Sequence, residues 1–223
     1  MTKLDLFFDS TKCFIGGHWV APLSGDYLPI ENPSTGETIG QLPRGGAEDI
    51  AAAVAAAEAA LAGQWGKTPA AERGRILSGI GRLVLDRADD LARIEAMDVG
   101  KPLKQAKADA LALARYLEFY GGACDKIHGE TIPYLDGYTV YTLREPHGVT
   151  GHIIPWNYPM QILGRSVTAA LAMGNAAVLK PAEEACLTAI AFAKLAEEAG
   201  LPPGALNVVP GLGEEAGAAL TAH

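Results

Sequence analysis

The sequence is poor in cysteine and in aromatic side chains. Its 223 residues include three cysteines, Cys13, Cys124 and Cys186, and aromatic residues make up 7% of the chain. The cysteines are odd in number and far apart, so neither a disulfide framework nor a CxxC metal or redox motif is present. Small buried thiols in a reducing compartment are the simplest explanation, and we expect a cytoplasmic protein.

Further absences narrow the class of protein. The five histidines show no HExxH or other zinc-binding spacing, so no metal site is expected. No run approaches the ~20 apolar residues of a membrane helix, and the amino terminus shows no cleavage pattern of a signal peptide. The formal net charge of −8 argues against nucleic acid as a main partner, because an acidic surface repels phosphate groups.

The chain divides into stretches of different composition. With 49% hydrophobic residues, it is typical of a globular protein with one large domain or two small ones. Residues 13–20 (CFIGGHWV) predict a tight hairpin around two glycines, and residues 32–36 (NPSTG) predict a second turn. An alanine-rich stretch with helical spacing follows, and it predicts helices at roughly 47–62, 70–87, 88–98 and 103–124.

The last third of the chain alternates strands and helices. Residues 139–144 alternate polar with β-branched or aromatic side chains, as a half-exposed strand does. The expected buried strands are 149–154, 176–179 and 206–209, and the expected helices are 160–173, 184–199 and 214–222. Such β-α-β-α-β-α order with short loops predicts an α/β fold with a Rossmann-like open parallel sheet.

In open α/β sheets, ligands bind beyond the carboxyl ends of the strands. The loop after the first of these strands places Trp156 and Asn157 between two prolines, and the Asn157 amide is a donor suited to an oxyanion. A merely structural turn is the alternative. In the loop after the third strand, residues 211–217 (GLGEEAG) have one residue too many for GxGxxG, and Glu214 and Glu215 favour helix capping as much as phosphate binding.

The loop after the second strand carries opposite charges. Lys180 ends a buried strand, where a lysine is costly unless it meets an anion or water. Glu183 is either an acid that stabilises the first turn of its helix or an acceptor for a ribose diol, which is typical of NAD rather than NADP.

Several segments together resemble the amino-terminal part of the NAD(P)-dependent aldehyde dehydrogenase superfamily. They are residues 14–20 (FIGGHWV), 32–36 (NPSTG), 148–159 (GVTGHIIPWNYP), 174–183 (GNAAVLKPAE) and 201–213 (LPPGALNVVPGLG). The resemblance spans nearly the whole chain, and the order and spacing of the Trp-Asn and Lys-Pro-x-Glu loops are highly specific. An unrelated doubly wound domain would need three such loops to coincide by chance.

The resemblance implies roles for individual residues. Asn157 would be the oxyanion amide, and Lys180 and Glu183 would contact the cofactor ribose, with NAD favoured over NADP. Further cofactor contacts would be Ile153, Ile154, Pro155, Trp156, Gly213 and Gly217. The aldehyde tunnel would be lined by Tyr158, Gln161, Ile162 and Arg165. Family members often carry tryptophan where this chain has Arg165, and the arginine suggests a polar, anionic or hydroxy-aromatic aldehyde, although a surface arginine is an equal alternative.

The resemblance also implies a domain organisation. Residues 1–135 would hold the hairpins and the helical part of the coenzyme-binding domain, 136–147 an oligomerisation strand, and 148–223 an incomplete NAD-binding βαβαβα unit. Residues 139–144 predict a homo-oligomer, a dimer or a tetramer. The family's nucleophilic cysteine and glutamate base lie beyond the matched segments, and none of the three cysteines fits the nucleophile's motif.

Two functions remain open from the sequence. The first is NAD-dependent oxidation of an aldehyde to a carboxylic acid through a cysteine thiohemiacetal, in an intact enzyme of which this chain is a truncated part, inactive in isolation. The second is a nucleotide-binding or partner-docking module without catalysis, which pairs through exposed sheet edges and apolar faces.

Overall fold

The computed structural model describes residues 6–223 of the chain. The first five residues, on which the signal-peptide prediction and the start of the first predicted domain depend, lie outside the described part. Two antiparallel hairpins come first: β1 (Cys13–Ile15) with β2 (His18–Val20), and β3 (Tyr27–Asn32) with β4 (Glu37–Pro43). The β1–β2 turn uses Gly16 and Gly17, both at positive φ, as the sequence predicts.

The alanine-rich stretch forms the expected helices, with each boundary within one residue of the prediction. They are α1 (Ala47–Ala62), α2 (Ala70–Asp86), α3 (Ala88–Val99) and α4 (Leu103–Ala123), with a 3₁₀ turn η1 (Trp65–Lys67) after α1. Gly100 ends α3 in the left-handed conformation, with φ of 78°. Small alanine side chains let these helices pack closely, because little volume separates their backbones.

The parallel sheet is present, with a difference at one edge. Strands β7 (Val149–Ile153), β8 (Ala176–Lys180) and β9 (Leu206–Val208) are parallel, and the crossovers are α5 (Pro159–Ala172) and α6 (Leu187–Glu198). The strand order is β2-β1-β9-β8-β7, so the first hairpin extends the sheet through an antiparallel pairing of Phe14 with Val208. The sequence analysis did not predict this pairing.

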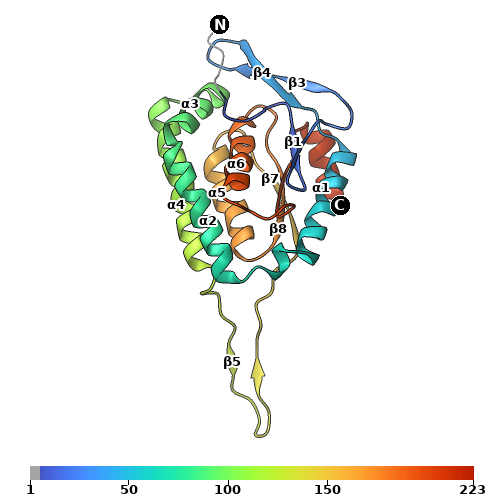
Figure 1. The fold of residues 1–223 in the computed structure, drawn as a ribbon, viewed down its shortest axis with the longest axis vertical. Coiled ribbons are helices and arrows are strands. Elements are labelled where there is room, and N and C mark those ends of the chain that lie inside the picture. The colour runs from blue at the N-terminus through green and yellow to red at the C-terminus, as the bar shows by residue number, and fades with distance from the viewer. Residues whose placement is uncertain (1–5) are drawn as a thin grey trace.

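Helices lie on both faces of the sheet, and β7 is an edge strand that is only partly covered. In Figure 1, α1 and the carboxyl-terminal helix α7 (Ala218–Ala222) lie on one side of the sheet, and α5 and α6 lie on the other. Helices α2, α3 and α4 form an outer layer over α5 and α6. The side chains enclosed between these layers form one main apolar core.

Two predicted helix starts were wrong. Helix α6 begins at Leu187 rather than at residue 184, because the Asp98 carboxylate accepts a hydrogen bond from the Leu187 amide and caps the helix there. The last helix does not run unbroken from residue 214, since a π-helical turn η2 (Gly213–Gly217) precedes α7.

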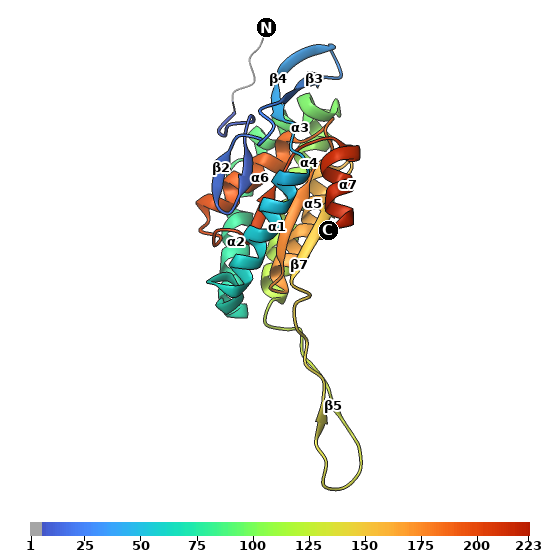
Figure 2. The ribbon, with the colours of Figure 1, turned by 90° about the vertical axis from the view of Figure 1, so that its right-hand side faces the viewer.

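The predicted oligomerisation strand is shorter than expected. Of residues 139–144, only β6 (Val140–Tyr141) is a strand, and it pairs with β5 (Thr131–Ile132) in a long hairpin that projects from the body (Figures 1 and 2). Within the described residues, no other element flanks this hairpin, so most of its length lacks the pairing that would define a strand. No helix in the described residues is both long and apolar enough to span a membrane.

Candidate functional site

Three loops follow the parallel strands at the same edge of the sheet. They are loop 1 (residues 154–158) after β7, loop 2 (181–186) after β8 and loop 3 (209–212) after β9. The Ile154 amide donates to the Lys180 carbonyl at 3.1 Å, which ties loop 1 to the end of β8. The Gly213 amide donates to Glu183 Oε1 at 3.1 Å, which ties the residue after loop 3 to loop 2. The predicted site loops are therefore adjacent.

Glu183 holds the buried charge of Lys180. Lys180 is 2% exposed, and its ammonium lies 2.6 Å from Glu183 Oε2. Partial burial by itself raises the pKa of the Glu183 carboxyl, but the hydrogen bonds from Lys180 and from the Gly213 amide outweigh it, so the net pKa lies below its usual range. Glu183 is therefore a carboxylate at neutral pH, and it can accept further hydrogen bonds from a ligand.

The predicted glycines lie beside this pair. A Cβ on Gly217 would be 3.9 Å from Lys180 Cδ and 4.0 Å from Ile153 Cδ1, so these three residues are neighbours. A Cβ on Gly213 would be 3.8 Å from Glu183 Oε1. Two acids, Glu214 and Glu215, follow Gly213. The charge of Glu215 is paired, because its carboxylate lies 2.6 Å from the Arg44 guanidinium.

A cavity of about 550 Å³ opens beside loops 1, 2 and 3. Its lining includes Trp156, Glu183 and Leu212 from the loops, residues 28–31 of β3, and Asp98 and Val99 at the end of α3. Trp156 is 57% exposed, and Pro155 is exposed beside it, whereas Ile154 is buried in the core. Of the residues predicted to line the cofactor cleft, Ile154 is therefore buried at the start of loop 1 and does not expose its side chain.

Asn157 is exposed in loop 1, and within residues 6–223 its side chain makes no hydrogen bond. The amide is free to donate to a ligand. Helix α5 begins two residues later, with Pro159 at its first turn. Pro155 and Pro159, which the sequence analysis expects to restrict the loop backbone, flank Trp156, Asn157 and Tyr158.

The predicted substrate residues share one face of the first turns of α5, which we call the α5 face: Tyr158, Gln161, Ile162 and Arg165. Arg165 donates from NH2 to Gln161 Oε1 and from Nε to the Tyr116 hydroxyl oxygen, both at 2.7 Å. Its side chain is exposed, and no carboxylate of the described residues lies within ion-pair distance of it. The guanidinium is oriented by neutral groups and retains its charge for a ligand.

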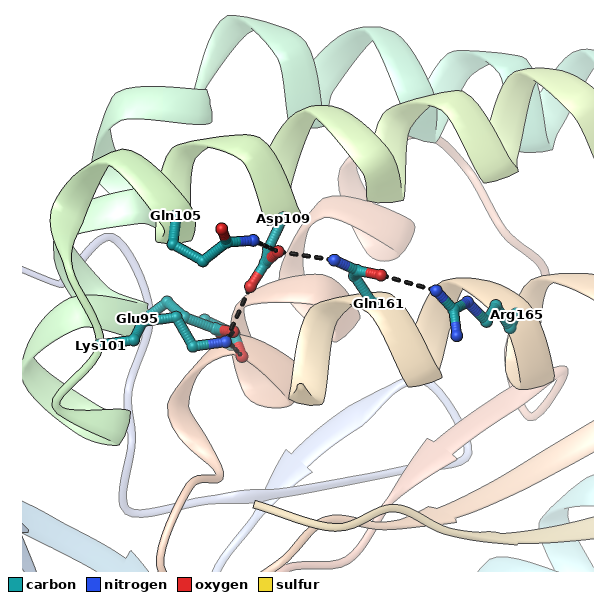
Figure 3. Close-up of polar contacts among 7 residues, drawn as sticks. Glu95, Lys101, Gln105, Asp109, Gln161 and Arg165 are labelled. Carbon is teal, nitrogen blue, oxygen red and sulfur yellow. Dashed lines mark hydrogen bonds and ion pairs between the residues drawn. The ribbon is translucent and has the colours of Figure 1, made fainter. Parts of the chain in front are cut away.

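Behind the α5 face lies a buried cluster of charges that the sequence analysis missed (Figure 3). Gln161 Nε2 donates to Asp109 Oδ1 at 2.7 Å, and Lys101 donates to Asp109 at 2.7 Å and to Glu95 at 3.0 Å. Burial lowers the pKa of the Lys101 ammonium, but the two carboxylates outweigh it and raise the net pKa. Burial raises the pKa of Glu95. The one feature of the sequence that could have indicated this cluster is Asp109, an acid within a helical stretch several of whose alanines are buried.

The three cysteines are poor nucleophiles in this structure. All three are free and buried, and burial raises the pKa of each thiol, that of Cys13 to about 12.

Within the part of the chain that is described, no group of three or more His, Cys, Asp or Glu side chains is placed to hold a metal ion. Asp98, whose pKa burial raises to about 7, keeps one carboxylate oxygen without a partner there.

The sequence profile described as "Aldehyde dehydrogenase family" matches residues 19–223. The chain belongs to the aldehyde dehydrogenase family. A hydroxyisobutyraldehyde dehydrogenase from Mycolicibacterium austroafricanum is 47% identical over 210 residues, which are 94% of this chain and 42% of that protein. The chain thus spans less than half the length of this and other curated relatives that it matches.

Solved structures of aldehyde dehydrogenases have the same fold. A Burkholderia cenocepacia protein assigned as an aldehyde dehydrogenase matches with a TM-score of 0.94 and 62% identity, over 95% of this chain and 44% of that one. An aldehyde dehydrogenase from Bacillus cereus, solved as a complex with NAD⁺, matches with a TM-score of 0.94 and 40% identity, over 96% and 44% of the two chains. The family resemblance and the α/β fold predicted from the sequence are confirmed.

Replacing Glu183 by glutamine is expected to destabilise the chain by about 1–3 kcal/mol at pH 7, because the buried Lys180 loses its charged partner. The folded pKa of Glu183 lies below its ordinary value of 4.5, so the ion pair stabilises the fold above that pH. The stabilisation is lost as the pH falls through the lower, folded pKa. Urea unfolding at pH 7 and below pH 4 measures both effects, with the exposed neighbour Glu184→Gln as the control. A difference that stays constant with pH would contradict the ion-pair explanation.

Proposed function

We propose that this chain supplies the cofactor cleft and the oxyanion donor of an NAD-dependent aldehyde dehydrogenase. The reaction takes an aldehyde, NAD⁺ and water to a carboxylic acid, NADH and a proton. The carrying observation is that the Asn157 amide, the Lys180–Glu183 pair and the Gly213–Gly217 turn converge at the carboxyl ends of three parallel strands. That edge is where open α/β sheets bind nucleotides.

The cofactor assignment depends on Glu183. Bound NAD⁺ supplies the hydride acceptor. A ribose diol donates hydrogen bonds, and the Glu183 carboxylate accepts them with its charge held in place by Lys180. A 2′-phosphate at the same position would meet that carboxylate and be repelled, which favours NAD over NADP. In this proposal Ile153, Pro155 and Trp156 form the wall of the cleft.

Asn157 acts on the aldehyde oxygen in this proposal. When a cysteine thiolate adds to the aldehyde carbon, the carbonyl oxygen becomes an oxyanion, and a fixed amide N–H stabilises it. None of the three cysteines of this chain is placed or ionised for that attack. We therefore assign the thiolate and the general base to other residues of the intact enzyme. The proposal also includes a cytoplasmic location for the protein.

In the full-length enzyme, Asn157→Ala and Asn157→Asp are expected to lower kcat by about 10²–10³-fold, because each removes the oxyanion donor. The aspartate variant keeps the size of the side chain, so it separates loss of the donor from loss of shape. The KM for NAD should change little. Steady-state kinetics on both variants would refute the role of Asn157 if the aspartate form kept wild-type kcat. Wild-type protein without aldehyde oxidation would instead favour the non-catalytic module.

Arg165 is proposed to bind a carboxylate or other anionic group on the aldehyde. Arg165→Ala is expected to reduce kcat/KM for a carboxylate-bearing aldehyde by about 10–100-fold, the value of one to two charge-assisted hydrogen bonds. A neutral aliphatic aldehyde of similar length should lose much less. Arg115→Ala, which removes an exposed arginine on α4, is the control. Equal losses on both aldehydes would contradict the proposal.

The projecting hairpin is proposed to mediate homo-oligomerisation. It exposes five large side chains, Tyr134, Leu135, Tyr138, Tyr141 and Leu143, each more than half accessible. An isolated two-stranded hairpin is marginally stable in water, and an apolar surface of this kind marks a protein contact.

The double variant Leu135→Ser/Tyr138→Ser is expected to shift the full-length protein toward monomer, because it removes apolar area from the hairpin. Sedimentation velocity measures the shift. Asp136→Ser, at the same hairpin tip, is the matched control and should leave the oligomer intact. An unchanged oligomer in the double variant would place the interface elsewhere.

A further inference from the structure

The ammonium of Lys101 has a separate partner in each of three directions. Lys101 lies between α3 and α4, and its side chain is 10% exposed. It donates to Glu95 Oε1 at 3.0 Å and to Asp109 Oδ2 at 2.7 Å, and it lies 4.5 Å from the centre of the Tyr158 ring. Gly100 before it ends α3 at a φ of 78°, and Pro102 after it, whose ring restricts φ, precedes α4. A lysine carries three donors, so this ammonium is fully engaged.

The three partners of Lys101 connect it to two parts of the molecule, helix α6 and the α5 face (Figure 3). Glu95 leads into the scaffold, because its second oxygen accepts from Thr188 on α6 at 2.9 Å. Asp109 leads to the α5 face, because its second oxygen accepts from Gln161, which in turn orients Arg165. Lys101 also reaches the α5 face directly through its contact with the Tyr158 ring, because Tyr158 follows Asn157 and immediately precedes α5.

A structural role alone does not account for this cluster. Glu95 and Asp109 are both fully buried, and a buried ion pair is often no more stabilising than apolar side chains of equal volume. The surrounding helices already pack through buried residues such as Ile94, Leu113 and Leu117. Two of the contacts end on side chains that are exposed, Tyr158 at 41% and Arg165 through Gln161. The cluster thus contacts Tyr158 and, through Gln161, contributes to the orientation of Arg165, which the Tyr116 hydroxyl also holds.

We propose that Lys101 is a positioning residue that orients Tyr158 and Gln161 toward the aldehyde. The inference rests on the proposed function, and it assigns to the loop between α3 and α4 a part in substrate binding. Lys101 touches neither substrate nor cofactor. It acts through the Tyr158 ring and, by way of Asp109, through Gln161.

The test uses the double variant Lys101→Met/Glu95→Gln. Lys101→Met alone would leave two buried carboxylates without a cation and could prevent folding. Removing one positive and one negative charge together leaves the net charge of the cluster unchanged. Asp109 keeps its hydrogen bonds from Gln105 and Gln161, and the glutamine at position 95 can still accept from Thr188. Thr188→Val is the matched control, because it weakens the same cluster on the scaffold side and leaves Lys101 against Tyr158.

The first measurement requires no activity. In the protein labelled with 3-fluorotyrosine, the ¹⁹F signal of Tyr158 is assigned by its loss in Tyr158→Phe. The signal is expected to shift and narrow in the double variant, because the ring loses the ammonium that holds it, and to stay in place in Thr188→Val. The signal of Tyr134, which lies between β5 and β6 in the projecting hairpin, serves as the internal reference. An unmoved Tyr158 signal in the double variant would overturn the proposal.

The second measurement is the kinetics of the full-length enzyme. The double variant is expected to raise the aldehyde KM by about tenfold, with the NAD KM changed less than about twofold. In a Tyr158→Leu background, the same two substitutions should add less than about a further twofold, because the ring through which Lys101 acts is gone. An equal rise in both KM values, or full additivity with Tyr158→Leu, would overturn the positioning role.

Failure of the proposed function would be visible separately. Wild-type protein that oxidises no aldehyde would remove the substrate from the argument, yet the fluorine signals would still report whether Lys101 holds Tyr158. A shifted signal together with unchanged aldehyde kinetics would mean that Lys101 orders the ring without serving substrate binding, and the inference would fall.

Discussion

The arrangement of the site depends on a lysine buried at the end of a strand. Lys180 ends β8 with its side chain out of water, and such a charge is tolerated only beside a counter-charge. Glu183 provides that counter-charge and, with its other oxygen, binds the amide of Gly213. One carboxylate therefore fixes the second loop relative to the third. Without it, loop 3 would lose its hydrogen bond to loop 2, whereas loop 1 would keep its backbone hydrogen bond to the end of β8.

Most of the buried charge lies near the site. The exception is Asp49 of α1, whose carboxylate accepts hydrogen bonds from the amides of Leu23 and Gly46. The alanine-rich helices and the parallel strands are enclosed by apolar side chains, whereas Lys101, Glu95, Asp109 and Asp98 lie at the ends of α3 and α4 next to loop 2 or the α5 face. Burying ionised groups there contributes little to the stability of the fold, because the cost of desolvating them offsets much of the attraction between opposite charges. Their positions are better explained by the orientation they give to exposed groups than by packing.

The sequence predicted the fold well where one local rule determined the structure. Helical spacing and capping glycines located α1 to α4 within a residue, and the three short loops after the parallel strands were predicted correctly. The start of α6 was predicted three residues early, because its cap is Asp98, 89 positions away along the chain. The cluster around Lys101 was missed for the same reason: its members come from four separate segments, and no spacing in the sequence joins them.

The pairing of β1 with β9 has a consequence for how the chain folds. Phe14 faces Val208 across this ladder, and Asn207 accepts a hydrogen bond from the Gly16 amide, across a separation of 191 residues. The β1–β2 hairpin leaves the ribosome before β9 and pairs with it only after the chain has grown by the 191 positions that separate Gly16 from Asn207. Closing so long a loop is slow, and the β1 edge of the hairpin has no partner until β9 is available. Its brevity, with three residues in each strand, limits its capacity to capture the edge of another nascent chain meanwhile.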